Sequence, residues 1–539
     1  MHKRFRSAAV ALATAALALG AAACGSDSGG SGGTSTGGGG STAADGGKIV
    51  YSNVAETASL DPAVVFSSDG FVFVRNVYEG LLEYEPGTLE VRPLLATEWT
   101  ESDDGLTYTF TLRDDVTFHD GAKFDAEAAK LGIERIIAVN QGPATLASNI
   151  KKIEAVSPTE LKITLKQKDV YFLGTLPKLP IVSPKALEEH KTADDEWATE
   201  WFTTHAAGTG PYKLVDWKRN SAIELAKNES YWREFEPGTP TEVTLRTDPD
   251  VQTALQLLGQ GEIDLMGAVG PDDSEAASHM PGVKIVEQPS LQIQVLPLNV
   301  SKGPLKDEKV RAAIAKAFDY NAIIDFYKGY AERANGPLPA EFSPAIAEQP
   351  AIEQNIEEAK QLLADAGHPN GGFTVEYLGL KGLAYEEFTG TLLEDVLGQL
   401  GIKVKQTIVP WPQMVEIQSN PKRAADISFL NMSPMTNDPS YMLKSSYASA
   451  NIASKGGYNW SYYENPELDK EINAISTIAD DAERQAKLAE LNKKIADQNI
   501  VVYVAAPKLA QPVRDEWDVT YDTVDATYSV RFFYVRKQG

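Results

Sequence analysis

The sequence has little of the chemistry that enzymes use. It contains one cysteine, Cys24, and six histidines among its 539 residues. A single cysteine excludes an intrachain disulfide and a CxxC metal site, and the absence of HExxH excludes the common zinc-protease helix. A phosphate-binding loop is missing, because Gly47-Lys48 is followed by Ile49 rather than by Ser or Thr. We therefore predict a protein that is not an enzyme and has no catalytic residues, no cofactor and no metal.

Positive charge is also scarce. The chain has 50 Lys and Arg against 75 Asp and Glu, a net charge of −25. Such a surface repels phosphate backbones, so we expect no nucleic-acid partner. From Lys48 onward no run approaches the roughly 18 apolar residues of a membrane helix. The hydrophobic content of 43% is that of a globular protein, and this length predicts two or three lobes, because one core rarely exceeds about 250–300 residues.

The first 24 residues resemble a bacterial lipoprotein signal. A basic start with Lys3, Arg4 and Arg6 leads into the apolar stretch 8–19, and alanines precede Cys24. This resemblance implies cleavage before Cys24, lipidation of that residue and anchoring to the outer face of the cell membrane. The alternative is an ordinary signal peptide, since the residue three positions before the cysteine is Ala rather than the usual Leu.

Residues 24–47 form the next predicted segment, the lipid-anchor cysteine followed by a linker. From residue 25 the composition is almost entirely Gly, Ser and Thr. Such a tract cannot bury a core and behaves as a flexible coil. It predicts a tether that holds a folded body away from the membrane.

The folded body mixes strands and helices. Apolar and polar residues alternate over 106–113 and 161–165, which predicts half-buried strands. The apolar run 500–506, which ends at Pro507, predicts a fully buried strand.

Helices are equally legible. Apolar residues recur at helical spacing over 310–318. Two further helices are predicted to begin after the N-cap residues Asn355 and Asn465, and Gly367 is predicted to end the first of them. The fold class is therefore α/β or α+β.

Several stretches, in order along 48–539, resemble the extracytoplasmic solute-binding proteins of bacterial ATP-driven importers, in the peptide- and nickel-binding family (family 5). The stretches that carry the resemblance are Ser59–Pro62 (SLDP), Tyr78–Tyr84 (YEGLLEY), Asp104–Glu127 (DGLTYTFTLRDDVTFHDGAKFDAE), Gly208–Leu214 (GTGPYKL), Gly261–Asp264 (GEID), Val310–Ile324, Glu357–Phe373 and Asn459–Ile472.

The resemblance implies an α/β fold of the periplasmic-binding-protein type (type II), with two lobes joined by a hinge and an extra domain inserted in lobe I. On that pattern the signal is 1–23, the anchor and linker are 24–47, lobe I is 48–80, 206–295 and 500–539, the insert is 81–205 and lobe II is 296–499. The hinge crossings are expected near residues 295 and 500. His119 falls in the insert, where a scaffold role is favoured over metal ligation.

The resemblance also implies a ligand site between the lobes. The candidate ligand-binding residues are Phe66, Ser67 and Ser68 from lobe I, Asn431, Met432, Ser433 and Met435 from lobe II, and Trp411, Tyr441, Tyr458 and Trp460 as aromatic walls. For Met432, Met435 and each aromatic residue, plain core packing is the alternative.

Two positions depart from the family pattern. Relatives often carry a Trp where this chain has Met432, and an Asp that pairs with the α-ammonium of a peptide ligand where this chain has Met435, although Asp438-Pro439 is kept. A buried ammonium without a counter-charge is costly. Either another acidic residue pairs with the ammonium group, or the ligand has no free amino terminus.

The predicted function is capture of an extracellular solute by hinge closure and its delivery to the permease subunits of an ABC importer. An oligopeptide or peptide-like ligand is ranked first, then a neutral organic solute or glycoside, then a nickel chelate. The rival classes are a secreted hydrolase and a surface adhesion protein. We expect a monomer that contacts the membrane through its lipid anchor.

Overall fold

The computed structural model describes residues 46–519 and 529–538. These described residues belong to one compact unit. The predicted signal, Cys24 and nearly all of the linker lie outside the described residues. No helix within the described ranges is both long and apolar enough to cross a membrane.

The largest sheet is built from strands that lie far apart in the sequence. Its hydrogen-bonded order is β18-β13-β19-β11-β1-β10-β9-β8, and β12 and β14 also pair with β19. The strands are β1 Lys48–Asn53, β8 Tyr212–Lys218, β9 Ala222–Lys227, β10 Glu242–Thr247, β11 Leu265–Met266, β12 Val283–Pro289, β13 Ile293–Pro297, β14 Ala331–Glu332, β18 Leu430–Met432 and β19 Val501–Arg514.

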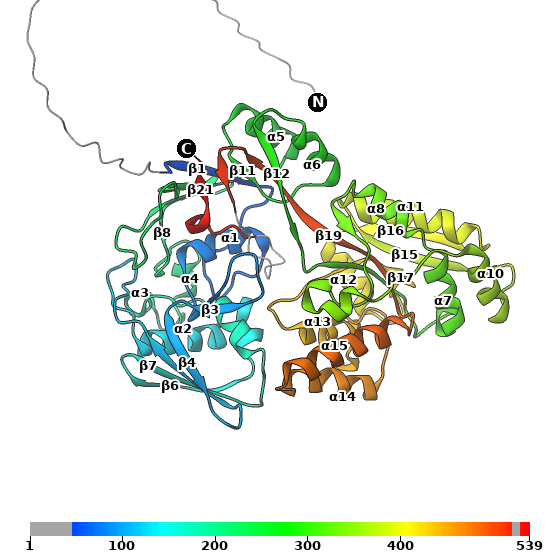
Figure 1. Cartoon of the computed structure of the whole chain (residues 1–539), viewed down its shortest axis with the longest axis horizontal. Coiled ribbons are helices and arrows are strands. Elements are labelled where there is room, and N and C mark those ends of the chain that lie inside the picture. Colours follow the sequence, from blue (N-terminus) through cyan, green and yellow to red (C-terminus); the bar gives the residue numbers. More distant parts are fainter. Residues whose placement is uncertain (1–45, 520–528, 539) are drawn as a thin grey trace, which may run out of the picture. The chain divides into compact units, whose positions relative to one another are not determined.

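Strand β19 links the two halves of this sheet (Figure 1). Residues 508–514 pair antiparallel with β12, and residues 501–505 pair antiparallel with β13. The predicted buried strand at 500–506 is confirmed, but its predicted end at Pro507 is wrong, because the strand continues to Arg514. Between the segments that pair with β13 and β12, Pro507 lies opposite Ala331 of the short strand β14, so the strand continues through the proline.

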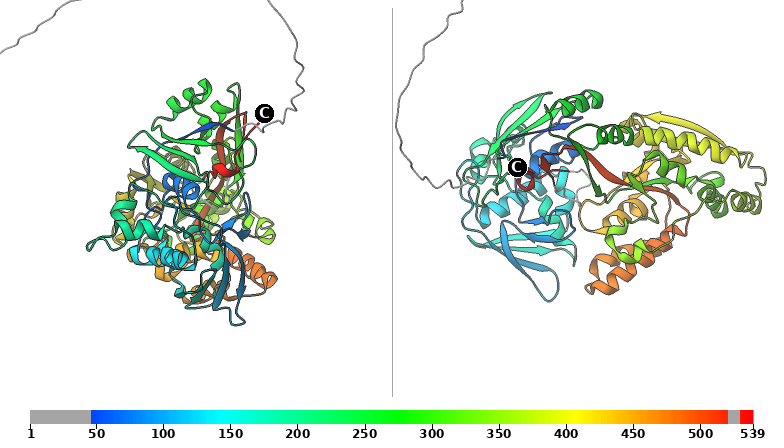
Figure 2. Two further views of the ribbon diagram at one scale, coloured as in Figure 1. Left: turned by 90° about the vertical axis from the view of Figure 1, so that its left-hand side faces the viewer. Right: turned by 45° about the horizontal axis from the view of Figure 1, so that its top comes forward.

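A separate four-stranded antiparallel sheet, ordered β4-β5-β7-β6, carries the chain between residues 96 and 165. Its buried side chains alternate along β5 and β7, which confirms both predicted half-buried strands. Helix α2 packs on β6 and β7 (Figure 2). The elements are β4 Ala96–Glu101, β5 Thr107–Leu112, α2 Ala126–Val139, β6 Ile150–Ser157 and β7 Glu160–Leu165, preceded by the hairpin β2 Leu82–Tyr84 and β3 Val91–Pro93.

A parallel three-stranded sheet, ordered β16-β15-β17, lies between residues 374 and 428, with α11 packed on β15 and β16. Its elements are β15 Thr374–Leu380, α11 Ala384–Gly398, β16 Lys403–Val409 and β17 Ile427–Ser428. The remaining helices and strands are α1 Ser68–Val77, α3 Pro184–His190, α4 Thr199–Phe202, α5 Val251–Gln260, α6 Pro271–Ser278, α7 Glu308–Ala317, α8 Tyr320–Phe326, α9 Pro344–Ala347, α10 Ile356–Asp365, α12 Trp411–Ser419, α13 Pro439–Tyr447, α14 Pro466–Ala474, α15 Asp481–Ala496, β20 Trp517–Asp518 and β21 Arg536–Lys537.

The predicted helix signals are confirmed. Helix α7 buries Val310, Ile314 and neighbours of the predicted face. The side chain of Asn355 accepts a hydrogen bond from Glu358 N at the start of α10, and Asn465 caps α14 in the same way. Gly367 follows α10 with φ of +85°, a conformation that L residues rarely adopt.

Hydrophobic packing groups the chain into several cores. One core draws on Ala63 and residues 81–181, a second on residues 49–78, 182–245, Leu265, 513–519 and 530–535, and two more on residues 291–505. The predicted lobe boundaries stay a prediction. Residues 182–202, which that prediction placed in the insert, pack with β1 and α1 instead.

The SLDP motif anchors the insert to lobe I through a buried ion pair. Both carboxylate oxygens of Asp61 accept hydrogen bonds from the Arg135 guanidinium in α2, each at 2.7 Å. The two side chains are 0% and 1% exposed, so the pair is fully removed from water. Arg135 also donates to the Trp197 carbonyl and stacks on Phe202, which occupies its remaining surface.

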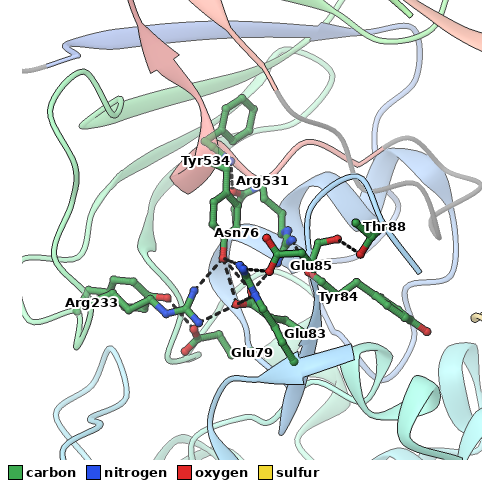
Figure 3. A network of polar contacts seen from close by, with 12 residues as sticks. Asn76, Glu79, Glu83, Tyr84, Glu85, Thr88, Arg233, Arg531 and Tyr534 are labelled. Carbon is green, nitrogen blue, oxygen red and sulfur yellow. Dashed lines mark hydrogen bonds and ion pairs between the residues drawn. The ribbon is translucent and has the colours of Figure 1, made fainter. Parts of the chain in front are cut away.

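A second charged network ties the β2–β3 hairpin to the C-terminal segment (Figure 3). Glu83 accepts from Arg531 at 2.5 Å, Arg233 at 2.7 Å and Arg92 at 2.9 Å. Burial alone would raise the pKa of Glu83, but the three guanidinium groups hold that pKa below its usual value. The hydroxyl of Tyr534 lies 3.0 Å from the same carboxylate.

The Asp61–Arg135 pair gives the first prediction. Arg135→Met leaves the Asp61 carboxylate buried without a counter-charge, and we expect the free energy of unfolding to fall by about 3–5 kcal/mol. Urea denaturation followed by circular dichroism measures this change. Lys152→Met removes an exposed ion pair with Glu154 and is the matched control, with an expected loss below about 1 kcal/mol. Equal losses in the two variants would contradict the anchoring role.

Candidate ligand-binding site

A cavity of about 380 Å³ lies where the start of α1 meets elements of residues 380–458. Its lining residues are Phe66, Phe71, Leu380, Glu386, Trp411, Met414, Phe429, Leu430, Asn431, Met432, Ser433, Met435, Tyr441, Ser445, Ser446 and Tyr458. This volume is within the roughly 300–1,000 Å³ of ordinary small-molecule pockets. Phe66 and Phe71 belong to the segment predicted as lobe I and the other lining residues to the segment predicted as lobe II.

A larger cavity, of about 530 Å³, lies elsewhere and has a different character. Its walls come only from residues 312–362 and 493–499. Charged pairs such as Lys316–Glu358, at 3.1 Å, stand at its edge. It lacks aromatic walls among the described residues and has no lobe I side, so the 380 Å³ cavity is the better candidate.

Strand β18 supplies the lobe II floor of the cavity. Asn431 and Met432 pair with Gln294 and Ile293 of β13, which fixes them beside the crossing strands. Met432 is buried, and the Tyr447 hydroxyl contacts its sulfur at 3.7 Å. The chain then leaves the sheet through Ser433 and Met435.

Aromatic side chains form the walls. Trp411 begins α12 and stacks on Trp460, with ring centroids 5.8 Å apart. Trp411 and Tyr458 remain 40% and 46% exposed, which is unusual for large hydrophobic side chains of this protein. Across the cavity Phe66 packs edge-on against Phe71 at 5.6 Å. Exposed aromatic faces around a hollow are typical of a site that closes on a ligand.

Most of the predicted site residues meet in this one cavity. Phe66, Trp411, Asn431, Met432, Ser433, Met435, Tyr441 and Tyr458 all line it. Ser67 is exposed, directly precedes α1 and does not line the cavity, and Ser68 is the first residue of that helix. Trp460 lies behind Trp411 as a buried support, 3% exposed.

Sequence reasoning missed several lining residues, of which Glu386 has the most chemistry. Glu386 lies in the first turn of α11 and is 2% exposed. Helical spacing puts it on the same face as Thr389, Leu393 and Leu397, all buried. The signal available in the sequence was a glutamate that shares the helical spacing of the buried residues of α11.

The environment of Glu386 disfavours its charge. Its Oε2 accepts a hydrogen bond from Leu380 N at 2.6 Å. Burial raises the pKa of Glu386 to about 7 from an ordinary value of 4.5, and the hydrogen bond from Leu380 offsets only part of this effect. No ion pair joins Glu386 to a basic side chain in the described part of the chain.

The Asp438-Pro439 pair, which matches the family pattern, begins a helix. The Asp438 side chain accepts a hydrogen bond from Ser440 N at 2.8 Å and caps α13, and Pro439 occupies its first turn. Burial raises the pKa of Asp438 to about 6. Asp438 does not line the cavity, so among the described lining residues the only carboxylate is Glu386.

His119 has a structural environment. Its Nε2 lies 2.9 Å from the Gly210 carbonyl, and His119 N donates to the Gly208 carbonyl, so the HDG and GTGPY motifs hold each other. Burial lowers the pKa of His119 to about 4, which keeps the imidazole neutral. Within residues 46–519 and 529–538 no group of three or more His, Cys, Asp and Glu side chains could hold a metal ion. A Cβ at Gly208 would overlap the Val77 carbonyl, so this motif requires glycine for close packing.

Direct contacts join the insert to the loop that precedes α13. The Tyr84 hydroxyl accepts a hydrogen bond from Asn437 N at 3.2 Å, and Asn437 Nδ2 donates to the Leu89 carbonyl at 3.2 Å. Val170 N also donates to the Ser476 carbonyl, at 2.9 Å. Segments around residues 84–89 and 170 are therefore hydrogen-bonded to segments around residues 437 and 476.

The family model for bacterial extracellular solute-binding proteins, family 5 (middle), matches residues 90–454. The chain belongs to this family. It is 30% identical over 466 residues to the probable D,D-dipeptide-binding periplasmic protein DdpA of Escherichia coli strain K12. The aligned residues cover 85% of this chain and 88% of that protein. The glutathione-binding protein GsiB of Salmonella paratyphi A is 28% identical over 434 residues, covering 79% and 82%.

A solved structure agrees with these relatives. The ABC transporter-associated periplasmic binding protein DppA from Helicobacter pylori, in complex with the peptide STSA, has a TM-score of 0.76 and 25% identity, covering 92% of this chain and 98% of that chain. The predicted family and the two-lobed, type II periplasmic-binding-protein fold are confirmed. As a family 5 protein, the chain is an extracytoplasmic solute-binding protein and not an enzyme.

The raised pKa of Glu386 predicts a pH effect on stability. An acid whose pKa is higher in the folded state than in the unfolded chain binds its proton more tightly when folded, so stability falls as the pH rises from about 4.5 to about 7. Glu386→Gln cannot ionise. The difference in free energy of unfolding, variant minus parent protein, should therefore rise by about 2–3 kcal/mol between pH 5 and pH 8. This figure uses 1.36 kcal/mol for each unit of difference between the folded and unfolded pKa values.

Urea denaturation at both pH values tests this. Glu387→Gln changes the exposed neighbour of Glu386 and is the matched control, with no pH-dependent difference expected. A difference between Glu386→Gln and the parent protein that stays constant with pH would contradict the assignment.

Proposed function

We propose that this chain is the substrate-binding lipoprotein of an ABC importer and that it captures a short peptide or peptide-like solute in the 380 Å³ cavity. The single observation that carries the proposal is this cavity, which has aromatic walls from both lobes and polar groups at Asn431, Ser433 and Ser445. Its size suits a ligand of a few residues rather than a long chain. The names of DdpA, GsiB and the peptide-bound DppA support the same class of ligand.

Capture would work by population shift. In an open form each lobe presents half of the wall, and a ligand that contacts Phe66 on one side and Trp411 on the other favours the closed form. Closure requires bending near the β12–β13 and β19 crossings, while each half-sheet moves as a body. The closed form is the one that we expect the permease subunits to recognise.

Delivery needs a membrane partner and an anchor. We infer that Cys24 is lipidated and that the Gly- and Ser-rich linker tethers the two-lobed body to the outer face of the membrane. The length of 25–47 allows a reach of roughly 25–30 Å at about 5–6 Å × √n. A diacylated cysteine supplies the two chains that stable anchoring takes.

Ligand recovered from the purified protein tests the function. Native mass spectrometry should detect a small organic molecule bound without a covalent link, and calorimetry with a dipeptide and tripeptide library should give saturable binding. Peptides and glycosides incubated with the protein should be recovered unchanged. Cleavage products would contradict the binding function and favour the secreted hydrolase.

The anchor has its own test. In bacteria fed a labelled fatty acid, the parent protein should carry label and sediment with the membrane, whereas Cys24→Ser should be unlabelled and remain in the soluble extracytoplasmic fraction. An unlabelled parent protein would indicate an ordinary signal peptide instead.

A further inference from the structure

Glu386 is a buried acid that faces a cavity without a counter-charge. The side chain is 2% exposed and lines the cavity, and its Oε2 has one hydrogen bond, from Leu380 N at 2.6 Å. No basic side chain of the described ranges lies within ion-pair distance of it. A carboxylate in this position costs free energy unless a cation or a set of donors meets it.

A second acceptor faces the same hollow. Asn431 lines the cavity, and its Nδ2 donates to the Tyr385 hydroxyl at 3.2 Å. Its Oδ1 is buried and has no partner within the described part of the chain. Buried acceptors are almost always satisfied by protein or water, so an unpaired acceptor beside a cavity is available to a ligand that donates hydrogen bonds.

The rest of the lining also suits a cation. The aromatic side chains of Phe66, Phe71, Trp411, Phe429 and Tyr458 line the hollow, and aromatic faces attract ammonium groups. The Phe71 ring already has the Lys178 ammonium over it, 5.5 Å from the ring centroid. A neutral apolar ligand would leave Asn431 Oδ1 unpaired and the Glu386 carboxylate without a counter-charge, and a ligand carboxylate placed beside Glu386 would be repelled. Met435, at the position where relatives carry an acid, supplies no charge.

We propose that Glu386 is a specificity-determining residue of this site and that it pairs with an organic ammonium group of the ligand. Asn431 Oδ1 accepts a second N–H of the same group, and the aromatic walls enclose it. The counter-charge thus comes from α11 rather than from the segment after β18. This assignment rests on the proposed function for its cavity, but it concerns the charge of the ligand and not its peptide nature.

Two ligand sources share this chemistry, a peptide amino terminus and a simple amine. The test therefore uses two probe pairs in calorimetry. The first pair is a dipeptide library with free amino termini and the same library N-acetylated. The second pair is phenethylammonium and the neutral phenethyl alcohol. Each is measured with the parent protein, Glu386→Gln and the control Glu387→Gln, after thermal melting has shown that the variants are folded.

In the parent protein the charged member of at least one pair should bind 10-fold or more tightly than its neutral partner. Glu386→Gln should weaken the charged member 10- to 100-fold and bring the ratio close to one, and Glu387→Gln should change neither. The comparison of charged and neutral probes needs no variant, so it stands even if Glu386→Gln does not fold.

The outcomes separate the two proposals. Peptides that bind equally well with and without acetylation, or equally well to Glu386→Gln, overturn the role of Glu386 and leave the peptide-binding function standing. Phenethylammonium bound through Glu386 with no peptide bound supports the role of Glu386 and removes the peptide as ligand. A charged probe that binds in neither pair overturns the role of Glu386.

Discussion

The continuity of strand β19 constrains everything else in this molecule. Residues 508–514 are hydrogen-bonded to β12 and residues 501–505 to β13, so one strand belongs to both halves of the sheet. A hydrogen-bonded strand cannot stretch, so movement between the halves would bend or twist β19 where its pairing passes from β13 to β12, at residues 506–507, which pair with β14. The cavity lies beside β18, which pairs with β13 next to this crossing. Such a bend would change the distance between Phe66 and the wall of the cavity formed by β18. The internal structure of each lobe would change less.

The cavity combines large apolar faces with few, badly solvated polar groups. That combination is better suited to binding a ligand than to catalysing a reaction on it. The one lining carboxylate has a backbone N–H as partner and no histidine or cysteine beside it among the described residues, so no acid–base pair or activated nucleophile is formed. By contrast, the charged groups that are fully paired, Asp61 with Arg135 and Glu83 with its three arginines, lie in the scaffold and join the insert to the rest of the chain.

The sequence predicted the local elements and the position of the cavity better than its chemistry. Alternation along β5, the caps Asn355 and Asn465 and the Phe66 and Met432 segments were readable because each depends on near neighbours or on an ordered motif. The extension of β19 through Pro507 was not, since it depends on pairing with β12, β13 and β14, which are distant from β19 in the sequence. Glu386 was missed because its importance comes from burial on a helix that no motif marks.

The central claim is that two lobes clamp a dissolved solute by moving about the β19 crossing. Small-angle X-ray scattering of the protein, freed of ligand by partial unfolding and refolding and then titrated with the molecule recovered from it, tests this most directly. The account predicts a decrease in the radius of gyration that saturates with ligand and reverses when the ligand is removed. Identical scattering curves without ligand and at saturation would contradict it.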